Sequence, residues 1–437
     1  VLDNQNNYKA ITSILIRDYP NVVGVKKGER LINSDDFENE IPKTLLNLRE
    51  SYLFCQGPPG TGKTFQAANA IVELIKQNKK IAITANSHKV IHNLLERIEN
   101  IAQNKRCLFK GLKKGNKDDM ETYFDGKFVS TGTDDRPFLK GLEDKSISLF
   151  AGTKFHLSNA YYRSKIDYLF VDEAGQMTIT DVIAIGVIAK NIILIGDQQQ
   201  LGQPTRGSHP NDSGKSILDF LLENRDTIDE TKGIFLNKTY RLHPTINNYI
   251  SNSFYDGRLL TNHNSENRKI NYPEACLIKN DGIHFLAMRH KDNSQKSEDE
   301  LKIIKLLMDQ LIGSIIIDNK EKRKLTIEDI LIVTPYNVQV NYLLENLKKG
   351  SRVGTVDKFQ GQEAPVTIVS MVSSDTDSLP RNKSWFFNRN RLNVALSRSQ
   401  CSSIILFNPD LLKTAPSDLE EIKLLNNFHK LLKFRVN

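Results

Sequence analysis

Short apolar runs alternate with helix-length amphipathic segments along the first half of the chain. Each run is about four residues long, which is the length and character of a strand buried on both faces. The alternation predicts a parallel sheet whose strands are joined by crossover helices. The predicted strands are 52–55, 81–84, 168–171 and 192–195, and the predicted helices are 63–77, 90–98 and 181–189.

The same alternation resumes in the second half of the chain, so the sequence predicts two α/β halves of similar size. Both halves carry strands without the strict polar–apolar alternation of a sheet with one exposed face. The predicted helices of the second half are 301–311 and 338–347, and its predicted strands are 330–333, 366–369 and 403–406.

Two polar stretches interrupt the pattern. Residues 104–144 are polar and contain several glycines, and we expect them to form an insertion in the first domain. Residues 205–232 are also polar, with one amphipathic helix near 217–222. We therefore place the first domain at 1–232 and the second at 233–437. A basic cluster lies in the first stretch and comprises Lys105, Arg106, Lys110, Lys113, Lys114 and Lys117.

The strongest chemical signal is a glycine-rich turn between the strand 52–55 and the helix 63–77. It matches G-x-x-x-x-G-K-[ST], and the strand–turn–helix context is the one that a P-loop requires. Its backbone N–H groups can cradle phosphate oxygens, Lys63 can reach the β- and γ-phosphates, and the Thr64 hydroxyl can bind Mg²⁺. The turn consists of Gly57, Pro58, Pro59, Gly60, Thr61, Gly62, Lys63 and Thr64.

Two further turns follow predicted strands of the first half. Asp172 and Glu173 come directly after the strand 168–171, where Asp172 can hold magnesium through its water shell. Glu173 can orient and deprotonate the attacking water. A glutamine of GDQQQL, after the strand 192–195, can contact the γ-phosphate and that water, although a plain polar loop also explains this turn.

Phosphoryl transfer needs positive charge on the transferring group, and the second half offers two candidate arginines. Arg241 lies in TYRLHP and Arg398 closes RLNVALSR. A bidentate guanidinium suits this task better than an ammonium. From the residues alone, either arginine could equally form a structural ion pair. A P-loop kinase or metabolic ATPase would leave both second-half motifs unexplained.

Composition and charge narrow the class of protein. The 437 residues are 39% hydrophobic and 26% charged, with a net charge of +8, which fits a polyanion-binding protein without requiring one. No run of eighteen apolar residues occurs, which argues against a membrane span and leads us to expect a cytoplasmic protein. The scattered cysteines Cys55, Cys107, Cys276 and Cys401 form no CxxC pair, which argues against zinc, iron–sulfur or disulfide sites.

Seven motifs in order resemble those of superfamily 1 helicases, in the branch of the nonsense-mediated-decay helicase and senataxin. The resemblance implies a P-loop NTPase with two tandem RecA-like parallel-sheet domains, an accessory insertion in the first, and Mg²⁺-ATP bound between the two domains. By this resemblance Tyr240 would stack on adenine, and Glu363 would bind near the ribose and phosphates. The residues that would line the ATP site are Lys63, Thr64, Asp172, Glu173, Gln200, Arg241, Glu363 and Arg398. The motifs are 57–64 (GPPGTGKT), 171–174 (VDEA), 196–201 (GDQQQL), 239–244 (TYRLHP), 334–339 (TPYNVQ), 353–363 (VGTVDKFQGQE) and 391–398 (RLNVALSR).

The resemblance also implies a site for single-stranded DNA or RNA. His88 departs from the family pattern, which reads Ser-Asn where this chain has Ser-His. Gln5 resembles the glutamine that reads adenine in the family, although its distance from the P-loop is unusually long and a surface glutamine explains it equally well. The residues that would face the strand are Ser87, His88, Tyr336, Gln339, Thr355 and Asp357.

The chain begins with Val1 instead of Met, so we expect it to be part of a longer protein. Residues 2–20 and the segment before the P-loop are similar to bacterial proteins in which such a helicase follows a RecB-like nuclease. We therefore expect a monomeric motor with an upstream nuclease domain in the same polypeptide. The accessory β-barrel of the family has no counterpart in this sequence.

The function that follows is an ATP-dependent translocase and helicase on single strands, moving 5′ to 3′ by resemblance. Two other interpretations stay open. One is an ATP-switched clamp that binds nucleic acid without unwinding it, and the other is the motor part of a nuclease–helicase.

Overall fold

The computed structural model describes residues 7–202, 210–319, 321–376, 379, 383–413, 415–416 and 418–436. The chain divides into two compact units. The first comprises Val1–Pro58, Gly62–Gln198 and Gly202–Asn237, and the second comprises Lys238–Asn437 together with the short pieces Pro59–Thr61 and Gln199–Leu201. Gln5 lies outside the described residues.

A single, wholly parallel sheet organises the first unit, with its strands in the order β4-β3-β5-β2-β6-β7-β1-β8. The strands are β1 (Tyr52–Gln56), β2 (Ile81–Thr84), β3 (Gly111–Lys114), β4 (Val129–Gly132), β5 (Leu149–Ala151), β6 (Ile166–Val171), β7 (Ala189–Gly196) and β8 (Gly233–Phe235). The helices are α1 (Lys9–Leu15), α2 (Phe37–Leu46), α3 (Lys63–Lys76), α4 (His88–Asn104), α5 (Arg136–Glu143), α6 (Lys154–Leu157), α7 (Ile179–Gly186) and α8 (Ile217–Leu222).

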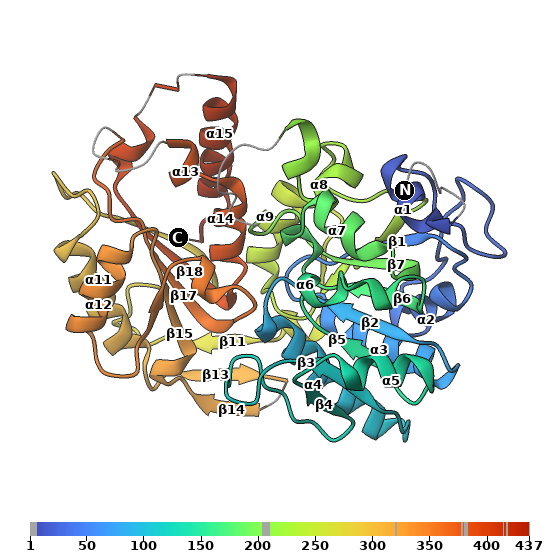
Figure 1. Cartoon of the computed structure of the whole chain (residues 1–437). Coiled ribbons are helices and arrows are strands. Elements are labelled where there is room, and N and C mark those ends of the chain that lie inside the picture. Colours follow the sequence, from blue (N-terminus) through green and yellow to red (C-terminus); the bar gives the residue numbers. More distant parts are fainter. Residues whose placement is uncertain are drawn as a thin grey trace. The chain divides into compact units, whose positions relative to one another are not determined.

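Helices cover both faces of this sheet, which is why its central strands are apolar throughout. α3 and α4 pack on one face, and α1 and α7 lie on the other (Figure 1). Alternate strand residues such as Leu53 and Ile83 join the core under α3 and α4, where Ile71 and Leu95 are also fully enclosed. The period-2 alternation of strand side chains supplies two cores from one sheet.

The segment 104–144, which we expect to be an insertion in the first domain, contains strands that join the main sheet. Its strands β3 and β4 extend the parallel sheet beyond β5, and α5 follows them. Three of its cations are engaged by the protein itself: Lys105 binds Glu73, Lys114 binds Asp135, and the buried Lys113 ammonium donates to a backbone carbonyl. β4 is the outermost strand of the sheet, where polar residues are tolerated, and β3 lies between β4 and β5.

The second unit is built on a second parallel sheet, in the order β12-β18-β17-β15-β16, with a small antiparallel sheet β11-β13-β14 beside it. Its strands are β9 (Lys238–Thr239), β10 (Leu260–Thr261), β11 (Lys269–Asn271), β12 (Gly282–Ala287), β13 (Ile315–Asp318), β14 (Glu321–Lys324), β15 (Ile330–Val333), β16 (Arg352–Gly354), β17 (Ala364–Ser370) and β18 (Ser399–Phe407). Its helices are α9 (Pro244–Phe254), α10 (His263–Glu266), α11 (Glu298–Leu311), α12 (Asn337–Asn346), α13 (Lys383–Phe386), α14 (Arg389–Leu396) and α15 (Leu419–Lys433).

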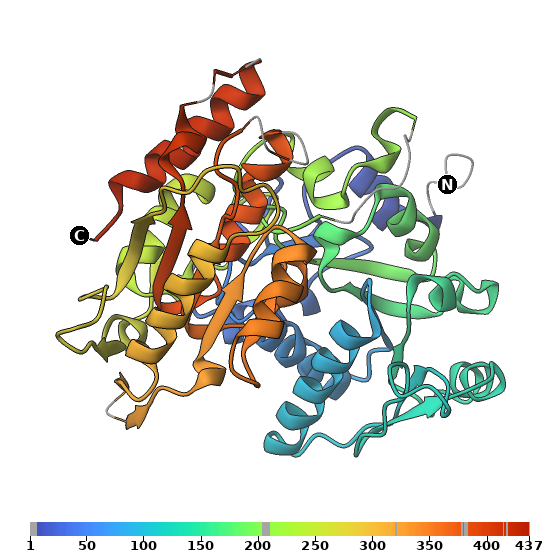
Figure 2. The ribbon, with the colours of Figure 1, turned by 90° about the vertical axis from the view of Figure 1, so that its left-hand side faces the viewer.

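Two helices close one face of this sheet. In Figure 2, α11 and α12 lie in the yellow-to-orange part of the chain, in front of the strands. Ile304 and Leu311 of α11 pack with Leu343 of α12 over Ile332 and Ile368 of the sheet. These apolar positions repeat at helical spacing in α11, so the predicted helix 301–311 is confirmed and the structure shows which of its faces is buried.

The division between the units differs slightly from the expected boundary after residue 232. β8 (Gly233–Phe235) follows that point, yet it pairs in parallel with β1 as the edge strand of the first sheet. The first unit therefore continues to Asn237. A three-residue strand carries too little periodicity to be recognised in the sequence, which explains the difference.

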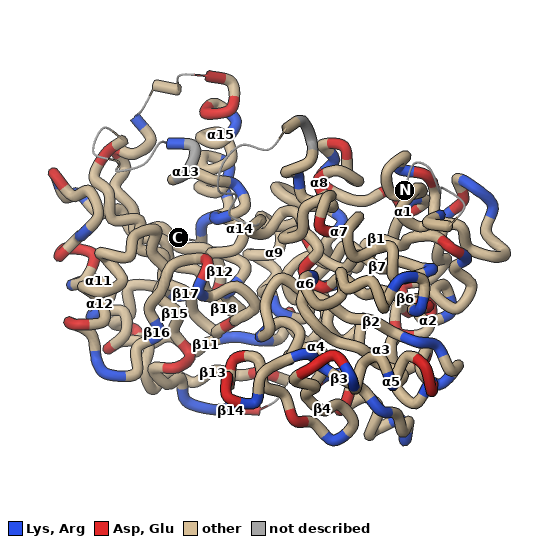
Figure 3. Tube along the Cα trace, viewed as in Figure 1, with Lys and Arg blue, Asp and Glu red and all other residues tan. Residues whose placement is uncertain are grey.

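Charge is distributed over both units. Figure 3 shows Lys and Arg interspersed with Asp and Glu along the chain. Among the described helices, none combines the length and the apolar character needed to cross a membrane.

A buried carboxylate on α4 should stabilise the first unit. Glu99 is 7% exposed and accepts the backbone N–H groups of Lys127, Phe128 and Val129 at 2.8–2.9 Å. Glu99→Gln turns one acceptor into a donor that faces these N–H groups, so we expect the free energy of unfolding to fall by about 1–3 kcal/mol. Urea unfolding measures this loss. Glu96→Gln, at an exposed position of the same helix, is the control, and an equal loss in both variants would contradict the assignment.

Candidate nucleotide and nucleic-acid sites

Three of the predicted motifs meet at one edge of the first sheet. β7 pairs in parallel with both β1 and β6, so the carboxyl ends of the three strands lie side by side. The glycine-rich turn follows β1, Asp172 follows β6, and Asp197 follows β7. The Gly57 N–H donates to the Gly196 carbonyl at 3.0 Å and so fixes the first of these turns against the third. Ligands bind at this edge in open α/β sheets.

The turn after β1 has the backbone of a phosphate cradle. Gly60 and Gly62 have φ of 73° and 78°, which residues with a side chain rarely adopt. Lys63 is the first residue of α3, and its ammonium donates to the Gly57 carbonyl at 2.6 Å, across the loop. A phosphate in the loop would therefore meet backbone N–H groups, a helix N-terminus and the Lys63 ammonium.

Asp172 is a carboxylate held in an environment that disfavours its charge. It is 3% exposed, and burial together with the charge of the neighbouring Glu173 raises its pKa to about 7. The Glu173 N–H, which donates to Asp172 at 2.9 Å, and the positive charge of Lys63 act in the opposite direction and lower the pKa. A nearby cation would favour the ionised form. The donor set of one buried carboxylate and the partly exposed Thr64 hydroxyl fits Mg²⁺, which takes few protein ligands and completes its shell with water and substrate phosphate.

Glu173 has an unusual backbone. Its φ is 50°, in the left-handed region that non-glycine residues seldom occupy, and this conformation costs about 1–3 kcal/mol. Its side chain is half-buried, beside Asp172 at the edge of the sheet. The turn thus separates the two carboxylates by burial, with Asp172 inside and Glu173 reaching solvent. This agrees with their predicted roles, in which the enclosed Asp172 is the metal ligand and the more accessible Glu173 is the base that meets water.

In the second unit, Arg241 is held by several groups at once. Its guanidinium forms an ion pair with Glu363 and donates to the Ser397 carbonyl at 3.1 Å. Burial acts to raise the pKa of Glu363, but the charge of Arg241 and hydrogen bonds from Arg241 and Gln400 hold it below its ordinary value. Glu363 is therefore a carboxylate at neutral pH and keeps Arg241 in place.

Arg398 is almost fully enclosed. It is 1% exposed, and it donates to the carbonyls of Val394 and Gln362 at 3.1 Å. A third contact reaches the Gln200 side chain at 3.3 Å, within the short piece of chain that groups with the second unit. The predicted catalytic residues Gln200 and Arg398 are thus adjacent, although the carbonyl contacts are also those of a structural arginine.

Tyr240 has the exposure that a stacking platform needs, with 56% of its surface accessible. Its N–H donates to the Gly60 carbonyl at 2.8 Å, and the Thr239 hydroxyl donates to the Pro59 carbonyl at 2.9 Å. These contacts lie within the second unit, which includes Pro59–Thr61. A Cβ on Gly60 would come within 2.4 Å of the Arg241 Cβ, so glycine is required there.

The predicted strand contacts of the first unit are at the start of α4. Ser87 is exposed and caps the helix by accepting the Val90 N–H. His88 is half-buried, and burial and the charge of Lys113 lower its pKa, so its imidazole is neutral at physiological pH. Its Nδ1 is buried and has no hydrogen-bond partner within the part of the chain that the structure describes. His88 therefore offers an uncharged ring where the family pattern has an asparagine.

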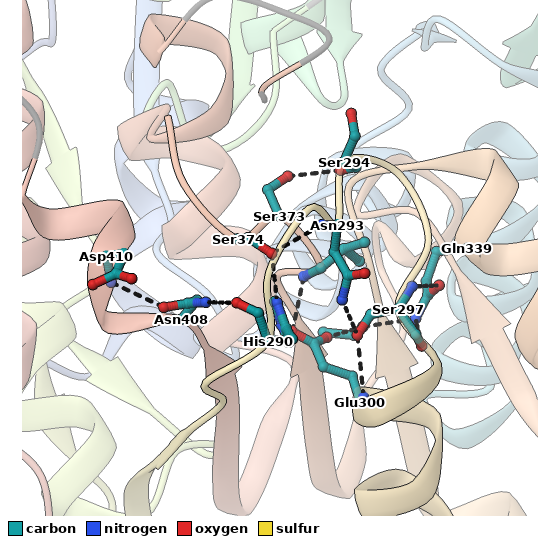
Figure 4. Close-up of polar contacts among 12 residues, drawn as sticks. His290, Asn293, Ser294, Ser297, Glu300, Gln339, Ser373, Ser374, Asn408 and Asp410 are labelled. Atoms are coloured by element: carbon teal, nitrogen blue, oxygen red, sulfur yellow. Dashed lines mark hydrogen bonds and ion pairs between the residues drawn. The ribbon is translucent and has the colours of Figure 1, made fainter. Parts of the chain in front are cut away.

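Two residues of the second unit that the resemblance places against the strand are buried in this structure. Tyr336 is 5% exposed and Gln339 is completely enclosed. The Gln339 amide is hydrogen-bonded to Ser297 and Ser370, partners far away in the sequence (Figure 4). The motif spacing alone could not show that these partners close over the turn.

The other two predicted contacts remain accessible. Thr355 is partly exposed after β16, and Asp357 is exposed and forms an ion pair with Arg391 at 3.2 Å.

The sequence motifs did not identify two residues that form hydrogen bonds to the predicted site residues. Arg268 donates to the Arg241 carbonyl at 2.9 Å, and Gln400 donates to Glu363 at 2.9 Å. Neither belongs to a recognisable pattern, because each meets its partner only in the folded chain.

Comparisons with known proteins agree with these motifs. Two family models, both described as AAA domain, match residues 39–214 and 214–410. The chain is 26% identical to the DNA replication ATP-dependent helicase/nuclease dna2 of Schizosaccharomyces pombe, over 82% of this chain and 26% of that protein. It is 24% identical to a regulator of nonsense transcripts 1 homolog of Arabidopsis thaliana, over 84% of this chain and 32% of that protein.

A third relative is the DNA polymerase alpha-associated DNA helicase A of Schizosaccharomyces pombe, 25% identical over 82% of this chain and 61% of that protein. The chain thus spans from about a quarter to less than two thirds of these relatives. A solved structure of arterivirus nonstructural protein 10 (helicase) with DNA is 15% identical, with a TM-score of 0.43, over 83% of this chain and 63% of that chain. With its ordered motifs and its two parallel-sheet units, the chain belongs to the superfamily 1 helicases, in the group that contains the nonsense-mediated-decay helicase.

Proposed function

We propose that this chain is an ATP-dependent translocase and helicase that moves along single-stranded DNA or RNA from 5′ to 3′. The observation that carries the proposal is the edge of the first sheet, where the P-loop backbone, Lys63 and the buried Asp172 converge. Relatives of this group are named as ATP-dependent helicases, which supports the same chemistry.

In this proposal the residues of the first unit divide the hydrolytic step. The loop 57–64 binds the phosphates, and Thr64 and Asp172 hold Mg²⁺, which when bound neutralises charge on the β- and γ-phosphates. Glu173 takes the proton of the attacking water, which its half-buried carboxylate at the edge of the sheet can reach. Gln200 orients that water.

The second unit contributes positive charge and the nucleoside contact. We assign Arg241 and Arg398 to the γ-phosphoryl oxygens, Tyr240 to adenine and Glu363 to the region of the ribose and phosphates. The exposure of Tyr240 and the ion pair that fixes Arg241 support these assignments. In this proposal ATP binding closes the two units and hydrolysis opens them. Each cycle changes the position at which one unit holds the strand relative to the other, and this produces translocation.

For the strand, the proposal retains Ser87, His88, Thr355 and Asp357 as contacts near the phosphates and bases. An upstream nuclease domain in the same polypeptide is also proposed, because one relative is a helicase/nuclease. We also propose that the protein works as a monomer. An ATPase assay beside a duplex-unwinding assay tests it: strand-stimulated hydrolysis without unwinding would favour the ATP-switched clamp.

The first prediction concerns the base. Glu173→Gln removes the carboxylate while Asp172 remains, so turnover should fall by about 10²–10⁴-fold with Mg²⁺-ATP binding retained. Lys63→Ala should instead weaken nucleotide binding. Steady-state hydrolysis and fluorescent-nucleotide titration separate the two effects, with Glu96→Gln as a neutral control. Hydrolysis by Glu173→Gln at the wild-type rate would remove the role assigned to Glu173.

The second prediction concerns the strand. A groove that binds backbone phosphates should lose affinity as salt rises, with a log–log slope of roughly −0.7 per phosphate neutralised. Homopolymers of different base should bind within about tenfold of one another, as expected of sequence-tolerant stacking. Fluorescence anisotropy across a salt series measures both quantities. A salt-independent affinity, or strict sequence preference, would contradict the proposed mode of binding.

The third prediction concerns Arg398. An arginine that contacts the transferring phosphoryl group only in the transition state can contribute about 10³–10⁵-fold in rate. Arg398→Ala should therefore bind ATP nearly normally, turn over about 10³-fold more slowly, and lose most of its stimulation by single strands. Thermal unfolding of the same variant controls for lost packing, because the side chain is buried. If its basal rate and its fold-stimulation both survive, Arg398 is a structural arginine.

A further inference from the structure

A buried arginine outside the sequence motifs contacts the backbone of Arg241. Arg268 lies between α10 and β11 and is 7% exposed. Its Nε donates to Asp318 at 3.0 Å, and its Nη1 donates to the Arg241 carbonyl at 2.9 Å. A guanidinium presents its N–H groups in a fixed planar fork, so these two contacts fix the Arg241 carbonyl relative to Asp318.

The small antiparallel sheet holds Arg268 in this position. Lys269 of β11 is opposite Ile317 of β13, so the next position along the two strands brings Arg268 beside Asp318. The Asp318 side chain is 41% exposed, and an ion pair with an exposed partner contributes little to stability. The pair therefore orients the Arg268 guanidinium more than it stabilises the fold.

Arg241 lies in the turn between β9 and α9, outside the hydrogen-bond ladders of both elements. Its N–H donates to the Thr239 hydroxyl at 3.3 Å, and its carbonyl accepts from Arg268. Its guanidinium is held separately, by Glu363 and the Ser397 carbonyl. Arg241 is thus fixed at the N–H, at the carbonyl and at the tip of the side chain, and Arg268 supplies the contact at the carbonyl.

Arg268 also acts on the ion-pair partner of Arg241. Burial raises the pKa of Glu363, whereas the charge and hydrogen bond of Arg241, the hydrogen bond of Gln400 and the charge of Arg268 lower it. Arg268 is enclosed, with its guanidinium directed at Asp318 and at the backbone, so we assign it no contact with a bound nucleotide. Its effect on hydrolysis would pass through Arg241 and Glu363.

We propose that Arg268 is a positioning residue for ATP hydrolysis. It fixes the backbone of Arg241, and thereby the direction in which the Arg241 guanidinium approaches the γ-phosphoryl group. A misplacement of a reacting group by about 1 Å can reduce the rate by about 10²-fold. This inference rests on the proposed function, because it takes Arg241 to contact the phosphoryl oxygens.

The test is a double-mutant cycle on kcat, measured at saturating Mg²⁺-ATP with oligothymidylate and, in parallel, oligouridylate. Arg268→Ala should lower kcat about 10- to 100-fold and leave the Kd of a fluorescent ATP analogue within about threefold of wild type. In the Arg241→Ala background the same change should alter kcat by less than about twofold, because the group that Arg268 positions is then absent.

Two milder variants keep the inference testable if Arg268→Ala does not fold. Asp318→Asn removes the charge that orients Arg268, at a partly exposed position, and should lower kcat roughly 2- to 10-fold, the range of one hydrogen bond. Arg268→Lys keeps the positive charge, but one ammonium does not reproduce the two directed contacts of the guanidinium, so its kcat should also stay below that of wild type.

Arg323→Ala is the matched control. Arg323 lies on β14 of the same antiparallel sheet, and its guanidinium pairs with Asp329 at 2.6 and 2.7 Å. The variant loses an ion pair in this sheet and leaves the contacts of Arg241 intact, so its kcat should match that of wild type. An equal loss of kcat in Arg323→Ala and Arg268→Ala would show that general disturbance of the sheet is responsible, and would overturn the inference.

The remaining results separate the inference from the proposed function. If the wild-type chain does not hydrolyse ATP, the proposed function fails and the inference fails with it. If Arg241→Ala turns over normally, the role assigned to Arg241 is wrong, and Arg268 has nothing to position. If wild type and Arg241→Ala behave as proposed, but Arg268→Ala stays within about twofold of wild type or its loss multiplies with that of Arg241→Ala, only the inference fails.

Discussion

The candidate sites depend on the parallel direction of the strands in each unit. Because β1, β6 and β7 run the same way, their carboxyl ends bring the P-loop, Asp172 and Asp197 to one edge of the first sheet. The second sheet likewise collects the turns after β15, β16 and β17 at a single edge. An antiparallel neighbour would send its following turn to the opposite edge. The functional segments are therefore dispersed in sequence and adjacent within each unit.

Three buried carboxylates differ in how far hydrogen bonds and nearby charges compensate for their burial. Glu99 and Glu300 each accept several donors that oppose the cost of desolvation, although burial still raises the pKa of Glu300. Asp172 is equally buried, but its pKa rises to about 7 because burial and Glu173 outweigh the Glu173 N–H and the Lys63 charge. A carboxylate in that state gains more from a bound cation than one already satisfied by the protein. This environment would suit Asp172 to its proposed role as a ligand of Mg²⁺.

The sequence predicts those parts of the fold whose signal is local. The strand 81–84 and the helix 63–77 are confirmed within a residue, as β2 and α3, because apolar runs and a helix-start signal occur within them. The strands β3 and β4 could not be recognised, since their polar residues look like a loop until β3 pairs with β5 and β4 pairs with β3. Similarly, the burial of Gln339 depends on Ser297 and Ser370. Motif spacing locates a functional turn but does not decide which of its side chains face outward.

Backbone strain occurs at the same place in both units. Glu173 follows the end of β6 by two residues and Val372 follows the end of β17 by two residues, and both have positive φ. Neither is glycine, so each conformation costs free energy that the surrounding fold must supply. At Glu173 the conformation separates an enclosed carboxylate from an accessible one, and at Val372 it brings the backbone N–H to Glu300. The fold holds these turns in place without a ligand. ATP or a strand would therefore bind to groups that are already ordered, and less of the binding free energy would be spent on ordering them.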